Sequence, residues 1–459
     1  MKLGEYPVIE DNIFVSEVVT PHRVDRLIYD TVTRGKRHPN EAVFSFLKLA
    51  TGKLTFKEII DELAKKADES PHDIWPKLSD LADYMVKEGL LRILTHPVDT
   101  PRIIPPSVHL VHRLENVSLE VTTLCNLKCG HCYADAGKKR PDELTTKEIK
   151  HAIDLLWETG VLAITFTGGE PLLHPDIFEL MEYARNKPMT VVLFTNGTLI
   201  TPAVVEKLKK LQVYRVNISI DGPDADTHDK FRGVPGSFNK TITGIKLLKK
   251  AQIPIHASTS LTKPVYKRVK DVLQLLKGLG ITDSKIWPPT FSGRSNYEDV
   301  FITIDEFREA MEDMHAFEYG QTHQKQEFKY SKSLENCGVG WSALVIKSNG
   351  VVTPCPSFDI EFSLGNIKTD SIHDIWNNSE LLNKLRKLSV YKTEECKTCE
   401  FAAMCKGGCI ADVYMRRGEF SCYDPYMCVA FEVSKNDFIP VEVDDTVKEC
   451  AIHFQSFGD

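Results

Sequence analysis

Three cysteines between residues 125 and 132 could hold an iron–sulfur cluster. Cys125, Cys129 and Cys132 have the spacing C-x3-C-x2-C and directly follow the run Val117 to Leu124. Cysteine thiolates are the usual ligands of [4Fe–4S] clusters, and three of them leave one of the four irons open to a small molecule. Because soft thiolates also select zinc, a zinc knuckle or a set of buried thiols is the alternative for this stretch alone.

A second motif, Gly168-Gly169-Glu170-Pro171, follows a predicted buried strand at Val161–Thr167. Glycines at a strand end let the backbone approach a ligand closely, although this motif alone is also typical of a plain turn. Together the two motifs resemble those of the radical SAM superfamily. The resemblance implies that the open iron chelates the amino and carboxylate groups of S-adenosylmethionine. Reductive cleavage then yields a 5′-deoxyadenosyl radical, which removes a hydrogen atom from the substrate.

The resemblance also implies cofactor contacts outside the cysteines. Asn217, Ser219 and Asp221 alternate at the end of a predicted strand and therefore share one face, although Asp221 also opens a run with the composition of a turn. In the family this strand contacts the methionine carboxylate and the ribose, which suggests Ser219, with Arg232 as a salt-bridge partner of the carboxylate. His131 stands where the family has an aromatic residue near the adenine; a lone histidine is more often structural. The expected cofactor-binding residues are His131, Gly168, Gly169, Glu170, Ser219 and Arg232. No catalytic residue is identified.

A further cysteine array lies between residues 330 and 435, with the pattern C-x12-G-x4-C, a gap, C-x2-C-x5-C-x3-C, and two more cysteines. Two C-x2-C pairs would indicate structural zinc, but only one is present. The pattern resembles the SPASM domain, which carries two auxiliary [4Fe–4S] clusters. The resemblance assigns to one cluster Cys337, Cys355 and Cys409, and to the other Cys396, Cys399, Cys405 and Cys428. Cys422 either completes the first cluster or is a spectator, which would leave an open iron; we interpret Cys450 as an ordinary residue.

Composition places the chain among ordinary globular proteins. It has 459 residues, enough for two or three domains, with 42% hydrophobic and 26% charged residues. The formal net charge of −7 and the absence of a basic block argue against nucleic acid as a partner. Neither a signal peptide nor a membrane span is recognisable, so we expect a cytoplasmic protein. Twelve cysteines in that compartment indicate metal or redox chemistry rather than disulfides.

Strands and helices alternate through the middle of the chain and must position both motifs. The expected strands are Val117–Thr123, Val161–Thr167, Thr190–Thr195, Tyr214–Ile220, Ile253–Leu261 and Ser284–Trp287. Six βα units predict an α/β fold, a parallel sheet curled into a partial (β/α)6 TIM-like barrel. Because barrel sites form where strands end, the cluster loop, the glycine motif and the run from Thr195 to Gly197 should meet there.

The first 95 residues read as a separate domain of a hairpin (Ile9 to Val19 and Arg23 to Thr33), three short helices and a returning strand at Leu90 to Leu94. This order predicts a winged helix-turn-helix. A DNA-binding domain or a structural cap is the alternative, although an acidic second helix argues against DNA. In front of a radical SAM core, the layout resembles the PqqD-like RiPP recognition element, which binds a leader peptide by adding it to a sheet edge. The expected segments are 1–95 (recognition element), 96–112 (proline-rich linker), 113–325 (radical SAM core), 326–440 (SPASM domain) and 441–459 (tail).

The whole chain resembles maturases of subtilosin-type sactipeptides or ranthipeptides. The resemblance implies intramolecular thioether crosslinks, cysteine sulfur to carbon, in a ribosomally made precursor peptide, with three [4Fe–4S] clusters and S-adenosylmethionine as cofactors. The partners would be the precursor, held through its leader, and an electron donor such as flavodoxin or ferredoxin. The alternatives are a carbon–carbon crosslinking maturase, an anaerobic sulfatase-type formylglycine maturase, and a non-catalytic peptide-binding or zinc-stapled scaffold.

Overall fold

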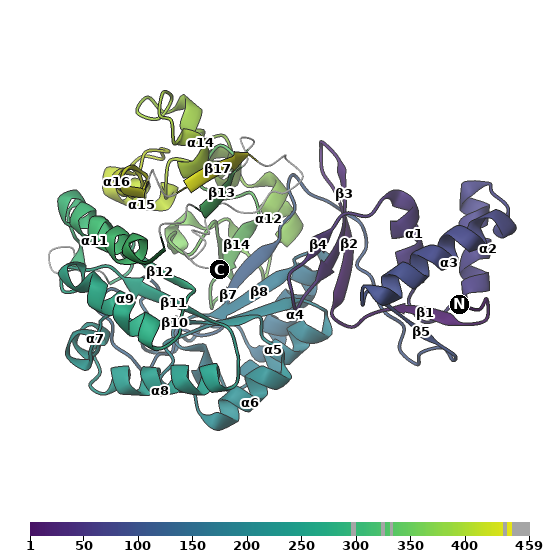
Figure 1. Ribbon diagram of the computed structural model, residues 1–459, viewed down its shortest axis with the longest axis horizontal. Coiled ribbons are helices and arrows are strands. Elements are labelled where there is room, and N and C mark those ends of the chain that lie inside the picture. Colours follow the sequence, from purple (N-terminus) through teal and green to yellow (C-terminus); the bar gives the residue numbers. More distant parts are fainter. Residues whose placement is uncertain (295–299, 323–325, 331–333, 435–437, 443–459) are drawn as a thin grey trace.

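The computed structural model describes residues 1–294, 300–322, 326–330, 334–434 and 438–442. Its centre is a nine-stranded sheet in the order β12-β11-β10-β9-β8-β7-β14-β15-β16 (Figure 1). Six of these strands are parallel neighbours: Asn116–Glu120 (β7), Ala163–Thr167 (β8), Thr190–Thr195 (β9), Arg215–Ser219 (β10), Ile255–Ser260 (β11) and Ser284–Trp287 (β12). All six expected strands are present, so the prediction of a partial barrel of βα units is confirmed.

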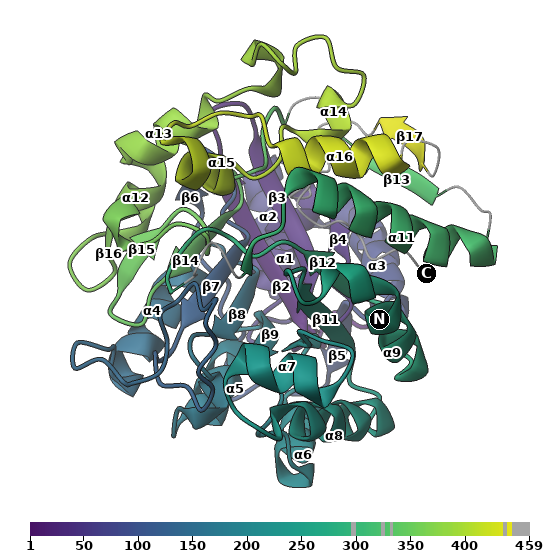
Figure 2. The same cartoon turned by 90° about the vertical axis from the view of Figure 1, so that its left-hand side faces the viewer.

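Helices follow the barrel strands and cover the outside of the sheet (Figures 1 and 2). They are Thr146–Glu158 (α4), Ile177–Asn186 (α5), Pro202–Lys210 (α6), Ala225–Arg232 (α7), Ser237–Lys250 (α8), Val269–Gly278 (α9) and Ile304–Thr322 (α11), with short 3-10 helices at Pro171–Leu173 (η1) and Tyr266–Arg268 (η2). Local sequence sets where they begin. The side chain of Thr145 accepts from the backbone of Glu148, whose carboxylate accepts in return, and this capping box starts α4.

The C-terminal cysteine segment continues the barrel sheet. Ala343–Ile346 (β14) pairs in parallel with β7, and Val351–Thr353 (β15) and Gly365–Asn366 (β16) follow in antiparallel order. The remaining elements are Gln326–Tyr330 (β13), Ile360–Phe362 (η3), Ile372–Asn378 (α12), Glu380–Arg386 (α13), Val390–Lys392 (η4), Ala402–Cys405 (α14), Ile410–Arg417 (α15), Pro425–Ser434 (α16) and Phe438–Glu442 (β17). Figures 1 and 2 show those from α14 onward above the barrel. Because β14 lies beside β7, the cysteine array is held against the strand that leads into the cluster loop.

The N-terminal segment has the expected order of a hairpin, three helices and a returning strand. Its elements are Tyr6–Ile9 (β1), Ile13–Val19 (β2), Val24–Asp30 (β3), Lys36–Arg37 (β4), Glu41–Leu49 (α1), Phe56–Ala67 (α2), Pro71–Lys87 (α3) and Leu91–Leu94 (β5). Strand β1 pairs with β5, while β2 and β3 belong to a second sheet, in the order β4-β3-β2-β6. The last member, Val108–His109 (β6), falls within the segment predicted to be a linker and pairs in parallel with β2.

The β2–β3 hairpin contributes to two hydrophobic cores at once. Alternate residues of the hairpin face opposite ways, as in any strand. Phe14, Val18, Leu27 and Tyr29 belong to the core of the barrel. Ile13, Val15 and Ile28 belong to the core formed with α1, α2 and α3. Figure 1 accordingly shows β2, β3 and β4 between the N-terminal helices and the barrel. The hairpin therefore completes the barrel core in addition to the core that residues 1–95 form among themselves, and the division into domains stays a prediction.

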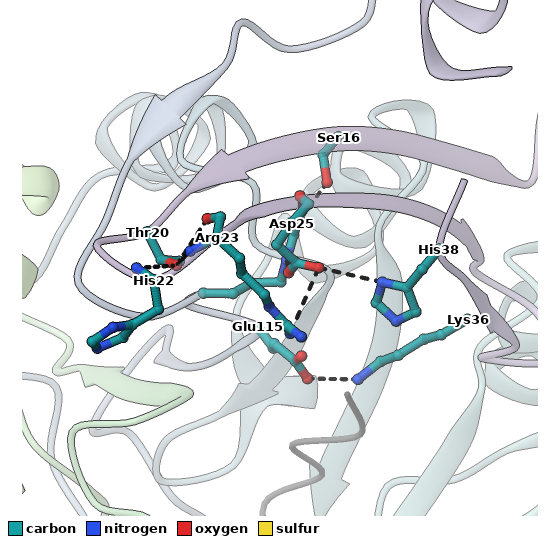
Figure 3. Close-up of polar contacts among 9 residues, drawn as sticks. Ser16, Thr20, His22, Arg23, Asp25, Lys36, His38 and Glu115 are labelled. Atoms are coloured by element: carbon teal, nitrogen blue, oxygen red, sulfur yellow. Dashed lines mark hydrogen bonds and ion pairs between the residues drawn. The ribbon is translucent and has the colours of Figure 1, made fainter. Parts of the chain in front are cut away.

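Polar contacts close the same junction. The Tyr29 hydroxyl lies 2.9 Å from Oγ1 of Thr190, the first residue of β9. Arg113 donates to the Asp25 carboxylate at 2.6 Å, and both side chains are buried. Figure 3 shows that the Asp25 carboxylate also faces His38 and that Lys36 of β4 reaches Glu115, at 2.8 Å. The N-terminal sheet is thus anchored at the amino-terminal ends of the barrel strands.

In the parts of the chain that the structure describes, no helix is both long and apolar enough to cross a lipid bilayer. Cys450 and most of the predicted tail, residues 443–459, lie outside the described residues.

Candidate active site

The cluster loop carries its three cysteines between the end of β7 and α4. Cys125 donates its backbone N–H to Gly137, and Gly137 donates to the Thr123 carbonyl at 2.8 Å, which closes the loop. Burial, together with the charges of Glu170 and the neighbouring thiols Cys129 and Cys132, raises the pKa of Cys125 to about 11. A thiol with a raised pKa is protonated at neutral pH, and it must lose this proton to bind a metal as a thiolate. Cluster binding would therefore release protons.

Gly168 and Gly169 are required by the backbone of the cluster loop. A Cβ on Gly168 would lie 2.3 Å from the Thr122 oxygen, and one on Gly169 would lie 2.4 Å from the Leu124 oxygen. The N–H of Gly169 donates to the Thr122 carbonyl at 2.7 Å, so the two motifs are joined directly. Both glycines also line the cavity described below. The two glycines therefore allow a close approach of the chain to itself, and the predicted approach of this backbone to a ligand stays a prediction.

Glu170 braces the next loop. Its buried carboxylate accepts from the Thr195 hydroxyl at 2.7 Å and from the Asn196 N–H at 2.8 Å. Burial raises the pKa of Glu170 to about 7, although the same hydrogen bonds favour the charged form. The side chain holds the ends of β8 and β9 together, and the predicted contact of Glu170 with the cofactor stays a prediction.

Asp221 and Arg232 form a buried ion pair beside the cluster loop. The Asp221 carboxylate also accepts from the Ser260 N–H at 2.7 Å, and Arg232 lies 3.6 Å from Sγ of Cys129. Burial opposes ionisation of Asp221, but the Arg232 guanidinium outweighs it and holds the pKa of Asp221 below its usual range. Arg232 was predicted to pair with the methionine carboxylate; in the structure its described partner is Asp221, and the cofactor contact stays a prediction.

A cavity of about 430 Å³ opens at the carboxyl ends of the barrel strands. Asn217, Ser219 and Asp221 all line it, which confirms the shared face predicted from alternation. His131 lines it too and stacks on Phe231, with ring centroids 3.9 Å apart. Burial lowers the pKa of His131 to about 4, so the ring is neutral at physiological pH. The cavity places the cluster loop, the glycine motif and these strand ends around one volume.

The C-terminal thiols gather into two sets. Cys409 lies close enough to Cys337 and Cys355 for their charges to interact. The same holds among the four thiols Cys396, Cys399, Cys405 and Cys428. These neighbours follow the division predicted from the SPASM pattern, but no three histidine, cysteine or acidic side chains among the described residues are placed so that they could hold a metal ion. That the two sets ligate clusters stays a prediction. The thiol neighbour of Cys422 is Cys396, whose Sγ donates to the Cys422 carbonyl at 3.3 Å, so Cys422 stands beside the second set.

Comparison with known proteins decides the family. Residues 119–276 match the radical SAM superfamily and residues 337–400 match the SPASM iron–sulfur cluster-binding domain. The AdoMet-dependent heme synthase of Methanosarcina barkeri is 33% identical over 335 residues, which cover 68% of this chain and 95% of that protein. The chain belongs to the radical SAM/SPASM family. Its cofactors are therefore S-adenosylmethionine, a [4Fe–4S] cluster and further iron–sulfur clusters in the SPASM domain.

Two other proteins resemble this radical SAM/SPASM chain over more of its length. The antilisterial bacteriocin subtilosin biosynthesis protein AlbA of Bacillus subtilis is 32% identical over 389 residues, covering 81% of this chain and 83% of AlbA. The crystal structure of Streptococcus suis SuiB bound to the precursor peptide SuiA has a TM-score of 0.63 and covers 91% of this chain and 98% of SuiB, at 16% identity. The last comparison shows that the two chains share a fold.

The cavity of this radical SAM/SPASM protein fits its cofactor. Within the described residues, Asn217 Oδ1, Thr259 Oγ1 and His131 Nδ1 are buried without a hydrogen-bond partner, and all three residues line the cavity. Buried polar atoms are normally paired, so such atoms indicate a ligand with hydrogen-bonding groups. A volume of this size is typical of small-molecule sites.

The sequence did not predict the role of Gly293 and Arg294. Arg294 donates to the Cys129 carbonyl at 3.1 Å and to the Ala136 carbonyl at 2.5 Å, and its own N–H donates to the Cys132 carbonyl. A Cβ on Gly293 would lie 2.2 Å from the Cys132 oxygen. Gly293 and Arg294 thus hold the cluster loop in place from the segment that follows β12. This segment contains no recognisable motif, so no local signal in the sequence indicates the two residues.

Proposed function

We propose that this protein is a peptide maturase that forms thioether crosslinks, cysteine sulfur to carbon, within a ribosomally made precursor peptide. The observation that carries the proposal is the N-terminal unit of a hairpin, three helices and a returning strand. The fold similarity to SuiB bound to its precursor peptide, which covers 91% of this chain, supports it. The similarity to AlbA, named for subtilosin biosynthesis, extends over 81% of the chain and supports a thioether product.

The residues divide the work by position. Cys125, Cys129 and Cys132 would hold the radical cluster, and Ser219 and Arg232 would orient S-adenosylmethionine in the cavity. When bound, this pair of cofactors supplies a 5′-deoxyadenosyl radical that removes a hydrogen atom from the acceptor carbon. In the set of Cys337, Cys355 and Cys409, Cys355 directly precedes Pro356 and Ser357, which form part of the cavity lining. This set would hold the auxiliary cluster that binds the cysteine sulfur or accepts the surplus electron.

The N-terminal sheet would capture the leader. Strand β4 has only two residues, so most of the outer edge of β3 has no neighbouring strand among the described residues. An extended peptide can add to such an edge through main-chain hydrogen bonds. An electron donor such as flavodoxin or ferredoxin would reduce the radical cluster.

Heme synthesis is a second candidate, favoured by the 33% identity to the Methanosarcina heme synthase over 95% of its length. That alignment leaves about a third of this chain unmatched. The N-terminal unit offers a sheet edge that suits peptide capture, so we place peptide maturation first. A carbon–carbon crosslink and formylglycine formation are further alternatives.

Mass spectrometry of a modified precursor separates these functions. The reconstituted enzyme is incubated anaerobically with S-adenosylmethionine, reductant and a peptide encoded by a short cysteine-containing reading frame next to this gene. A loss of two hydrogens together with cysteines blocked to alkylation is expected. The same mass loss with every cysteine still alkylated would mean a carbon–carbon link. An unmodified peptide, with heme appearing in cells that express the protein, would favour the second candidate.

A further inference from the structure

Most charged groups that line the cavity have a partner within the chain. The Glu120 carboxylate lies 3.1 Å from the Lys347 ammonium, and both side chains are buried. Asp221 is paired with Arg232. These pairs neutralise one another, so they leave little net charge for a substrate to meet.

Lys285 is the exception. It lies on β12, lines the cavity, and has neither an ion-pair partner nor a hydrogen-bond partner among the residues that the structure describes. Its ammonium lies 5.8 Å from the centre of the Trp287 ring, a cation–π contact. Burial lowers the pKa of Lys285, because a cation in the wall of a cavity is costly unless a ligand supplies an anion.

Register places Lys285 relative to the cofactor site. Ser219 of β10 is opposite Ser258 of β11, which is opposite Lys285, so the three residues form one row on the cavity face. Two strand spacings put Lys285 about 10 Å from Ser219. Strand β12 is the edge of the nine-stranded sheet, and the charge of Cys409 reaches Lys285 from the SPASM side. Lys285 therefore stands between the predicted cofactor position and the first auxiliary set.

We propose that Lys285 is a specificity-determining residue that pairs with a carboxylate of the substrate. A single ammonium matches a singly charged group; phosphate sites usually gather arginines or several donors, and the cavity's only described arginine, Arg232, is already paired. Trp287, Pro288 and Pro289 line the cavity on the same side and suit a short aliphatic stem. This inference rests on the proposed function, and there the carboxylate is an aspartate or glutamate near the crosslinked residue.

A double-mutant cycle between enzyme and peptide tests the pairing. Each Asp and Glu of the core peptide is changed singly to its amide, and Lys285→Gln is compared with Lys246→Gln, an exposed lysine on α8. Affinity of the cluster-loaded enzyme for fluorescent, leaderless core peptide is measured by anisotropy, without turnover. Lys285→Gln should weaken binding of the parent peptide roughly 30-fold, one amide peptide should lose as much with the wild type, and combining the two changes should add nothing. Lys246→Gln should match the wild type.

Two other results would overturn the inference. If Lys285→Gln leaves peptide affinity unchanged but shifts the reduction potential of an auxiliary cluster, the lysine serves the cluster. If it raises the KM for S-adenosylmethionine equally with every peptide, it serves the cofactor. Affinity is measured without turnover and is therefore independent of the reaction. If the wild-type enzyme binds the parent peptide more tightly than an amide peptide but forms no crosslink, only the proposed function would be wrong. If the wild-type enzyme forms the crosslink but binds every amide peptide as tightly as the parent peptide, this inference alone would be wrong.

Discussion

At the scale of single residues, Gly169 shows how the backbone dictates a motif. The position of a Cβ there is 2.4 Å from the Leu124 oxygen, whereas Gly278, at the end of α9, has open space around it. We expect Gly169→Ala to destabilise the protein by about 1–3 kcal/mol or more and to abolish 5′-deoxyadenosine formation, because the cluster loop must move. Gly278→Ala should be neutral or slightly stabilising. Denaturant unfolding and a cleavage assay measure both, and equal behaviour of the two variants would contradict the packing argument.

Glu170 gives the molecule a pH-dependent contribution to stability. Its folded pKa of about 7 exceeds the unfolded value of 4.5, so the folded state binds the proton more tightly. The contribution is complete below the unfolded pKa and is lost as pH rises through 7. The unfolding free energy of the wild type, minus that of Glu170→Gln, should therefore fall by roughly 1 kcal/mol per pH unit between pH 5 and 7. Unfolding curves of the apoprotein across this range test it; a flat difference would show that the carboxyl stays charged.

At the scale of secondary structure, the two cores that share the β2–β3 hairpin can be perturbed separately by mutation. Tyr29 and Phe46 are both fully buried, the first in the barrel core and the second in the N-terminal helical core. Replacing either by alanine should cost about 3–5 kcal/mol. Tyr29→Ala should speed hydrogen exchange of the β9 amides, and Phe46→Ala should leave those amides protected. Equal exchange in the two variants would mean that the hairpin is not part of the barrel core.

The same scale shows what could be predicted from the sequence. The six barrel strands are predicted correctly because apolar runs and the glycines that follow them are local signals. Asn217, Ser219 and Asp221 were placed on one face by alternation alone. The pairing of β14 with β7 and the clamp of Arg294 on the cluster loop join residues far apart in the chain, which no local pattern records. Apolar residues on both faces of Ile13–Val19 were a signal of a strand buried on both sides, and this signal was missed.

At the scale of the whole molecule, metal content tests the division of the cysteines. Three cubanes would give about twelve irons per chain. The combined change of Cys125, Cys129 and Cys132 to alanine should leave about eight and eliminate 5′-deoxyadenosine formation, while Cys450→Ala should keep the full number. Iron and sulfide analysis after anaerobic reconstitution measures this. Stoichiometric zinc with little iron would contradict the assignment.

If the N-terminal sheet holds the leader as proposed, its distance from the cavity sets a minimum length for the precursor peptide. Tyr29 meets β9 at Thr190, and the cavity is lined by Thr195 and Asn196 at its other end. Six residues of strand span about 20 Å. A precursor should therefore need at least about six residues between its leader and its first crosslinked position. Crosslinking should fail when this spacer is cut to two or three residues and should survive Gly-Ser insertions. Full activity with the short spacer would place the leader elsewhere.

The hairpin shared by two cores limits how the enzyme can be recombined. A fusion joined at residue 96 would remove part of the barrel's own interior, so whole-domain exchange between such maturases should yield insoluble chimaeras. An exchange should instead replace the residues on one face of the hairpin and keep those on the other face. A designer would keep Phe14, Val18, Leu27 and Tyr29, which face the barrel. The helices and the opposite face of the same two strands could then be replaced. In this protein the part that can be exchanged is therefore one face of the β2–β3 hairpin with the helices packed on it, and not a continuous segment of the chain.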